Sequence, residues 1–274
     1  ITFNKARISV SSRVTPFDTY KNSNRIFSKG WFLKKFFPIV NKRANVLTCV
    51  SKDMIKQYKK IFPYTRQVGL YNIVLNSESY LNMKSKVSHS WFKKKDYQLA
   101  IAAGSLAKWK GFDDLIKAIN ILIKKKIKIK LVIIGSGPEK IRLNKLINKY
   151  ELQNRIKIFN PQFNTLKYFK NADIFVLSSK VEGMPNVLIE AMMCGCTVVA
   201  TNCHTGPREI IGKNKYGYLA KVGNPSDLSK KILSAFNKKI SPKKTKNILN
   251  KFSVNEVLKK HFSLLKIDRK DWLI

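Results

Sequence analysis

The sequence predicts an α/β protein whose larger part is a doubly wound parallel sheet. From residue 98 onward, short apolar runs alternate with amphipathic helical patterns. Strands that alternate with helices in this way form βαβ units, which are wound right-handedly into a parallel sheet. Of the 274 residues, 44% are hydrophobic, which is ordinary for a globular protein and too much for a disordered one. We therefore expect one large domain or two smaller ones.

The first strands of this sheet are predicted by apolar runs that end in glycine. The run YQLAIAAG, residues 97–104, is one such segment. The segment IKIKLVIIGSGPE, residues 127–139, begins with alternation and then becomes continuously apolar, which is typical of a strand covered on both faces. Gly135 and Gly137 predict a tight turn rather than a dinucleotide-binding motif, and Pro138 is suited to the first position of the next helix.

Amphipathic helices are predicted between the strands. In residues 110–125 the apolar side chains recur on one helical face, and they are Phe112, Leu115, Ile116, Ile119, Leu122 and Ile123. Asp113 and Asp114 occupy the first turn, where the helix dipole favours acids. Further strands are expected at 155–159, 173–179, 196–201 and 217–222, and further helices at 185–195, 207–211, 225–236 and 253–265. In the last helix we expect His261 to be a partly buried residue rather than a ligand.

The first 97 residues show a less regular pattern. A strand is expected at 46–50, a helix with a Ser cap at 51–62 and a strand at 65–72. Since the chain starts with Ile rather than Met, we expect these segments to be the later part of an α/β domain whose beginning is absent. The predicted division is a partial N-terminal domain and linker (1–97), a C-terminal α/β domain (98–252), and a final helix and tail (253–274). The aromatic and Lys-rich segment 30–40 favours core packing, with a membrane-surface helix as the alternative.

Net charge is +38, and a surface this basic attracts nucleic acid, anionic lipid headgroups or phosphorylated substrates. Because Lys, Asn and Ile are abundant throughout, a global compositional bias is the favoured cause, membrane attraction the second and nucleic-acid binding the third. No apolar run approaches the roughly eighteen residues of a transmembrane helix, and no secretory signal is visible.

The four cysteines are expected to be small buried thiols in a reducing compartment. They are Cys49, Cys194, Cys196 and Cys203. The second and third form a C-x-C pair, not the C-x2-C pair of common zinc sites, and no His falls at ligand spacing with it. The sequence therefore disfavours a metal site.

The segment SSKVEGMPNVLIEAM, residues 178–192, keeps two of the chain's 16 acidic residues within an otherwise apolar run. Pro185 is suited to the first helical position, and the N–H groups of residues 186–188 would then open beyond the preceding strand. A helix start after a parallel strand binds anions, and doubly wound sheets bind ligands at this edge. Glycine at position 183 allows a ligand to approach the backbone.

The two carboxylates of this segment, Glu182 and Glu190, have two interpretations each. A carboxylate inside an apolar helix needs a partner, and a ribose diol would suit Glu190, while Glu182 could reach hydroxyls beyond a bound diphosphate. This arrangement would fit a nucleotide sugar. Alternatively, Glu190 pairs with a nearby Lys and Glu182 is solvated. The residues alone leave both interpretations open.

The chain from about 97 to 236 resembles the C-terminal domain of the group 1, family-four retaining glycosyltransferases, which have the GT-B fold. The resemblance rests on motifs in the family's order, which are GSLAKWKGFDDLIKA, LVIIGSGPE, ADIFVLSS, EGMPNVLIEAMMCG, VVAT and GPREII. The Glu-x7-Glu element is characteristic of that family. Upstream, CVSKDM and LYNIV are similar to weaker family elements.

The resemblance implies roles for particular residues. Glu182 would contact the donor sugar, Glu190 the ribose, and Lys110 would neutralise the donor diphosphate, with Lys110 and Glu182 as the catalytic pair. The other implied donor-binding residues are Gly104, Ser105, Lys108, Gly183, Met184, Pro185, Asn186, Val187 and Arg208. A helix dipole and a lysine can stabilise the leaving diphosphate without a metal, so we expect no metal and no cofactor beyond the nucleotide-sugar co-substrate.

Two departures from the family pattern matter. The family usually has Arg where this chain has Ser105, and losing that bidentate cation should weaken catalysis unless Lys108 or Arg208 substitutes. For Arg208 the alternative is a surface residue of its turn. The family's N-terminal domain also carries a glycine-rich loop and often a catalytic histidine, whereas His89 resembles a linker position.

The resemblance thus implies a glycosyltransferase that moves a sugar from a nucleotide-diphosphate donor, expected to be a UDP-sugar, to a glycan or polyprenyl-diphosphate-linked acceptor. The reaction would retain the anomeric configuration and serve cell-surface polysaccharide, lipopolysaccharide or glycan biosynthesis. We expect a cytoplasmic protein with an anionic membrane surface as a further partner, and no nucleic acid. The alternatives are a donor-binding but inactive fragment or accessory subunit, and a basic nucleic-acid-binding protein.

Overall fold

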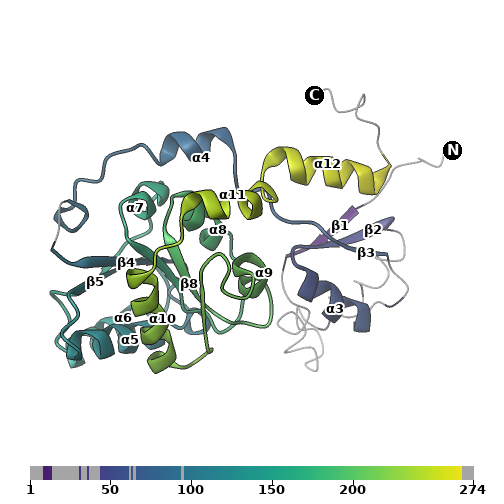
Figure 1. Ribbon diagram of the computed structural model, residues 1–274. Coiled ribbons are helices and arrows are strands. Elements are labelled where there is room, and N and C mark those ends of the chain that lie inside the picture. The colour runs from purple at the N-terminus through teal and green to yellow at the C-terminus, as the bar shows by residue number, and fades with distance from the viewer. Residues whose placement is uncertain are drawn as a thin grey trace.

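A computed structural model of the chain describes residues 9–13, 31, 36, 44–61, 63, 66–93 and 96–266. These residues contain two parallel sheets, a three-stranded one near the N-terminus and a six-stranded one that follows it (Figure 1). The predicted α/β class is therefore confirmed. The segment 30–40, for which core packing or membrane contact was predicted, lies outside the described residues except for Trp31 and Phe36.

The larger sheet has the strand order β6-β5-β4-β7-β8-β9, and all neighbours are parallel. Its strands are β4 (Gln98–Ala103), β5 (Ile129–Ile134), β6 (Ile156–Phe159), β7 (Ile174–Leu177), β8 (Thr197–Thr201) and β9 (Tyr218–Ala220). The chain adds β5 and β6 on one side of β4 and then returns to add β7 on the other side. Ligands of doubly wound sheets bind where the strand order reverses, which here is the edge beyond β4 and β7.

Helices cover both faces of this sheet. The helices α5 (Phe112–Lys124), α6 (Lys140–Lys149) and α10 (Pro225–Asn237) share one hydrophobic cluster with it. The helices on the other face are α7 (Leu166–Lys170), α8 (Asn186–Met193), α9 (Pro207–Ile211) and α11 (Pro242–Asn250). Their cluster continues into the smaller sheet and includes Leu47 and Met54, so a single core joins the two sheets.

The smaller sheet consists of β1 (Ser9–Ser12), β2 (Val46–Cys49) and β3 (Gln67–Gly69). Helix α3 (Lys52–Ile61) follows β2, and the backbone N–H of Met54 donates to Ser51 Oγ at 3.2 Å, so the predicted Ser cap is present. Helix α12 (Val254–Leu265) returns over this sheet (Figure 1), where His261 Nε2 lies 3.2 Å from Ser9 Oγ. His261 is partly buried, as predicted.

Several sequence-based boundaries need correction. Helix α6 starts at Lys140 rather than near Pro138, which lies in the preceding turn. Helix α4 (Ser77–Asn82) and helices α7 and α11 were not predicted, because they are short or carry few apolar residues. The tight turn is confirmed, since residues 137–139 form a bend and turn between β5 and α6. Gly135 and Gly137 also pack closely on the loop after β4, where an added Cβ would lie 1.9 Å from Gly104 O or 2.6 Å from Leu106 O. All four cysteines are buried and free, as predicted.

Candidate functional site

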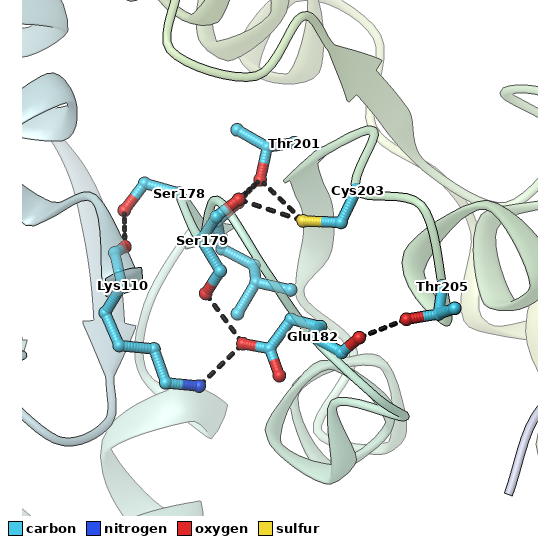
Figure 2. Close-up of polar contacts among 8 residues, drawn as sticks. Lys110, Ser178, Ser179, Glu182, Thr201, Cys203 and Thr205 are labelled. Carbon is cyan, nitrogen blue, oxygen red and sulfur yellow. Dashed lines mark hydrogen bonds and ion pairs between the residues drawn. The ribbon is translucent and has the colours of Figure 1, made fainter. Parts of the chain in front are cut away.

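The predicted catalytic residues Lys110 and Glu182 meet beyond the carboxyl ends of β4 and β7. Lys110 Nζ lies 2.6 Å from Glu182 Oε1, and their side chains are only 19% and 10% exposed. Ser179 Oγ donates to the same carboxylate oxygen at 2.7 Å. Figure 2 shows this network, which holds Glu182 within the protein. The interpretation of Glu182 as a solvated carboxylate is therefore wrong.

The loop after β8 supports the loop that carries Glu182 (Figure 2). The hydroxyl of Thr205 donates to the backbone carbonyl of Glu182, and Cys203 Sγ donates to Ser179 O at 2.9 Å. Thr201 Oγ1 lies within hydrogen-bonding distance of Leu177 O and Ser179 O, and its one proton can be donated to either carbonyl. Burial raises the pKa of the Cys203 thiol to about 11, so this thiol is a neutral donor at physiological pH.

These supporting residues were not predicted. They are Ser178, Ser179, Thr201, Cys203 and Thr205, and Ser178 Oγ donates to Lys110 O at 2.8 Å. One feature of the sequence could have indicated them. Each is a small hydrogen-bonding residue at or just after the carboxyl end of an apolar strand, where two loops of a parallel sheet come together.

The turn between β7 and α8 leaves backbone donors unoccupied. The backbone N–H groups of Gly183, Met184, Asn186 and Val187 donate to no acceptor among the described residues. Two predictions about this turn were wrong in detail. Pro185 is the cap residue with an extended backbone rather than the first helical residue, and the N–H expected to be free at position 188 donates to Pro185 O at 3.0 Å.

The smaller sheet approaches this turn closely. An added Cβ at Gly183 would lie 2.6 Å from Arg13 O and 3.9 Å from Met54 Sδ. Asn72 Nδ2 donates to Asn186 Oδ1 at 2.8 Å. Met184 is buried, so the free backbone donors, rather than the methionine side chain, face any ligand.

Glu190 differs from Glu182 in its surroundings. Within the part of the chain that the structure describes, its carboxylate forms no hydrogen bond or ion pair. The interpretation that it pairs with a Lys is therefore wrong. Burial raises its pKa above the ordinary value of 4.5, because desolvation disfavours the charged form. A partly buried carboxylate without a protein partner can accept hydrogen bonds from a ligand.

The residues of the loop after β4 surround Lys110. Gly104 has a φ of +152°, and an added Cβ would lie 3.6 Å from Lys110 Cε. Ser105 and Lys108 are exposed. Gly111, with a φ of +62°, packs so closely on the next loop that an added Cβ would lie 2.2 Å from Ser178 O. The loop thus holds Lys110 against the β7 loop.

Arg208 and Glu209 lie in α9, at the edge of the same region. Arg208 is exposed, and its Nε donates to Asn202 Oδ1 at 2.9 Å. Glu209 was not predicted, yet it accepts from the backbone N–H of Lys52 at 2.8 Å and from the hydroxyl of Tyr71 at 2.6 Å. Glu209 therefore links α9 to the start of α3 and to the segment after β3.

His89 caps the turn Ser90–Phe92 by accepting from the backbone N–H of Trp91 at 3.2 Å. It therefore has a structural role and is not part of the Lys110–Glu182 network. No three His, Cys, Asp or Glu side chains of the described residues gather where they could hold a metal ion. Within the same residues, no helix is both long enough and apolar enough to cross a membrane.

Comparisons with known proteins identify the family of this chain. The family model of the group 1 glycosyl transferases matches residues 83–251, more than half of the chain. An uncharacterized glycosyltransferase of Methanocaldococcus jannaschii is 39% identical over 136 residues, which are 47% of this chain and 34% of that protein. The N-acetylgalactosamine-N,N'-diacetylbacillosaminyl-diphospho-undecaprenol 4-alpha-N-acetylgalactosaminyltransferase of Campylobacter jejuni is 29% identical over 227 residues, 82% of this chain and 59% of that protein.

Among solved structures, Anabaena HepE in complex with UDP-glucose matches with a TM-score of 0.76 at 15% identity, over 96% of this chain and 72% of that one. A likeness at this identity shows the fold, which is the GT-B type that the motifs implied. The chain spans less than two thirds of either curated relative. On the family match and the fold together, the chain belongs to the group 1 glycosyltransferases.

Proposed function

We propose that the chain binds a nucleotide-sugar donor, a UDP-sugar, and transfers its sugar to a glycan or polyprenyl-diphosphate-linked acceptor with retention of the anomeric configuration. The biosynthesis of cell-surface polysaccharide, lipopolysaccharide or other glycans is the proposed setting. One observation carries the proposal, namely the turn before α8. Backbone N–H groups without an acceptor among the described residues, Lys110 and two carboxylates lie around this edge of the sheet.

The diphosphate of the donor fits this turn. Free N–H groups at a helix start bind anions, and the helix dipole adds to the attraction. A lysine ammonium carries three protons, so the contact of Lys110 with Glu182 leaves two for phosphate oxygens. When the bond between the sugar and the diphosphate breaks, these groups stabilise the charge that develops on the departing nucleoside diphosphate. We propose that this step uses no resident metal.

The two carboxylates would hold the sugars at either side of the diphosphate. Glu182 accepts from Lys110 and Ser179 through one oxygen, Oε1, which leaves Oε2 for a hydroxyl of the donor sugar. Glu190 has both oxygens free for a ribose diol. Arg208 and Lys108, which are exposed near this edge, are the candidates to replace the cation missing at Ser105.

The comparisons support the choice of donor and acceptor classes. The Anabaena structure holds UDP-glucose, and the name of the Campylobacter enzyme specifies a diphospho-undecaprenol acceptor. The net charge of +38 supports attraction to an anionic membrane surface at the inner face of the cytoplasmic membrane. We propose no nucleic-acid partner.

Calorimetric titration with UDP and a transfer assay test this proposal together. Saturable binding of UDP that exceeds binding of ADP and GDP is expected, with transfer of radiolabelled sugar from a UDP-sugar to a polyprenyl-diphosphate-linked glycan. The configuration of the product at the anomeric carbon, measured by NMR, tests retention. UDP binding no tighter than that of the other nucleoside diphosphates would reject the donor.

A second candidate function is donor binding without turnover. It is favoured by Ser105, which is exposed and carries no charge where the family usually has Arg. In that case UDP binds but no transfer is detected, and Ser105→Arg should tighten UDP binding because a guanidinium holds phosphate at two points. Transfer by the unaltered chain would reject this candidate.

A further inference from the structure

A lysine pocket lies where α3, α12 and the segment after α11 meet. Its volume is about 430 Å³, and it is lined by Lys52, Tyr71, Lys251, Glu256, Lys259, Lys260 and Ser263. None of these residues belongs to the Lys110–Glu182 network. Lys52 comes from the smaller sheet's helix, whereas the other lysines come from the segment that returns to that sheet at the end of the described chain.

The four lysines of the lysine pocket are not paired with carboxylates of the described residues. None of their ammonium groups forms an ion pair with another described residue. Among the described residues, Glu256 is the one carboxylate on the lining. Glu209 lies nearby and keeps its negative charge, because its two oxygens accept only from neutral donors, the backbone N–H of Lys52 and the hydroxyl of Tyr71. Four lysines thus face two carboxylates, Glu256 and Glu209. The pocket therefore holds an excess of positive charge.

Lys260 shows how closely these charges lie. Burial lowers its pKa, Lys52 and Lys251 lower it further, and Glu209 opposes them. Its Nζ also lies 6.0 Å from the centre of the Tyr71 ring. A like-charged cluster gathered at a concave surface gains most from a ligand with more than one negative charge, since such a ligand offsets several repulsions at once.

We propose that the lysine pocket binds a phosphate or diphosphate group, either as the free anion or as part of an acceptor molecule. The ammonium groups would contact the phosphate oxygens, and the Ser263 hydroxyl would donate to one of them. Because Lys52 begins α3 and Lys260 lies in α12, the bound anion would contact both helices. This site stands whether or not the chain transfers a sugar.

The alternative is that the lysines merely reflect a chain with 54 Lys and Arg residues. It predicts that any two exposed lysines contribute equally to anion binding. Calorimetry with inorganic diphosphate at fixed salt separates the two explanations. The pocket variant is Lys52→Gln with Lys260→Gln, and the control is Lys60→Gln with Lys230→Gln, two exposed helical positions outside the pocket that remove the same charge.

The pocket variant should lose at least about tenfold in affinity for inorganic diphosphate, against less than about twofold for the control. A third variant, Lys110→Gln, removes binding at the donor site and should leave the binding assigned to the pocket in place. Equal losses in the pocket and control variants would overturn the proposal. A loss of diphosphate affinity that occurs only in the Lys110→Gln variant would also overturn it. Thermal unfolding without ligand checks folding, and the pocket variant should be no less stable because a repulsion has been removed.

A comparison of two probes distinguishes the sources of the phosphate. If farnesyl diphosphate binds more tightly than inorganic diphosphate, and the pocket variant has a lower affinity for both, the site binds a lipid-carried acceptor. If the two probes bind with equal affinity, and the pocket variant has a lower affinity for both, the site binds a free anion. If the pocket variant binds both probes as the unaltered chain does, the site is rejected.

Discussion

Two carboxylates eight positions apart on one segment have opposite surroundings. Glu182, in the loop after β7, contacts Lys110 and Ser179, while its backbone carbonyl accepts from Thr205. Glu190, in α8, is partly buried and has no hydrogen bond or ion pair among the described residues. The protein thus binds the carboxylate at the loop end of the segment, Glu182, and provides no described partner for the carboxylate at the helix end, Glu190.

This difference separates a positioning role from a recognition role. A buried carboxylate that the protein satisfies adds stability and fixes its neighbours, whereas one left without a partner costs stability and is retained when a ligand uses it. Variants on the loop side should therefore lower the free energy of unfolding. Variants of Glu190 should raise it and weaken ligand binding.

Lys110→Gln should give the largest loss of stability. It leaves the enclosed Glu182 carboxylate without its cation, which should cost about 3 kcal/mol in the free energy of unfolding. Denaturant unfolding measures the loss. UDP affinity should fall at least about tenfold.

A double-mutant cycle with Glu182→Gln provides the control. If the two side chains interact as the 2.6 Å contact indicates, the double variant should be more stable than the sum of the single losses predicts. Additive losses would show that the pair contributes nothing in solution.

Gly206→Ala should be the next most damaging change. Gly206 has a φ of +86°, and an added Cβ would lie 2.5 Å from Gly183 O, so we expect a loss of about 2 kcal/mol. Gly223→Ala is the matched control, since its φ is +67° but no atom lies within 4 Å of the added Cβ. If both variants are destabilised equally, backbone strain rather than contact with Gly183 causes the loss of stability.

Thr205→Val removes the hydroxyl that donates to Glu182 O while keeping the shape of the side chain. A carbonyl left without its donor should cost about 1 kcal/mol, measured by denaturant unfolding. Thr165→Val, at a helix start where the hydroxyl makes no capping bond, should change the free energy by a few tenths of that. A neutral Thr205→Val would argue against this support of the loop.

The strands of the larger sheet could be predicted because they are continuous apolar runs, as in residues 129–134, and Ser51 could be predicted as a cap because a helical pattern follows it. The contacts that surround the site could not be predicted from the sequence. Lys110 and Glu182 are 72 residues apart, and no periodicity places two such loops in contact. The backbone of Pro185 depends on the packing of the turn against Gly206, which sequence spacing does not specify. The proposed domain boundaries and site roles stay predictions.

The stability of Glu190→Gln depends on pH in a defined direction. Burial raises the folded-state pKa of Glu190 above 4.5, so its contribution to stability is greatest at low pH and is lost as pH rises through the folded-state pKa. At pH 7 the Gln variant should therefore be more stable than the unaltered chain by about 1 kcal/mol. The advantage should shrink as pH falls toward 4.5, and thermal unfolding across this range measures it.

The most direct test of the central claim combines that stability measurement with calorimetric titration of UDP on the same Glu190→Gln protein. The account predicts opposite signs, with a higher unfolding midpoint at pH 7 and an affinity for UDP lower by at least about tenfold. Glu151→Gln, an exposed position, should change neither quantity. UDP affinity that is the same in the Glu190→Gln variant and the unaltered chain would contradict the assignment of Glu190 to the ligand.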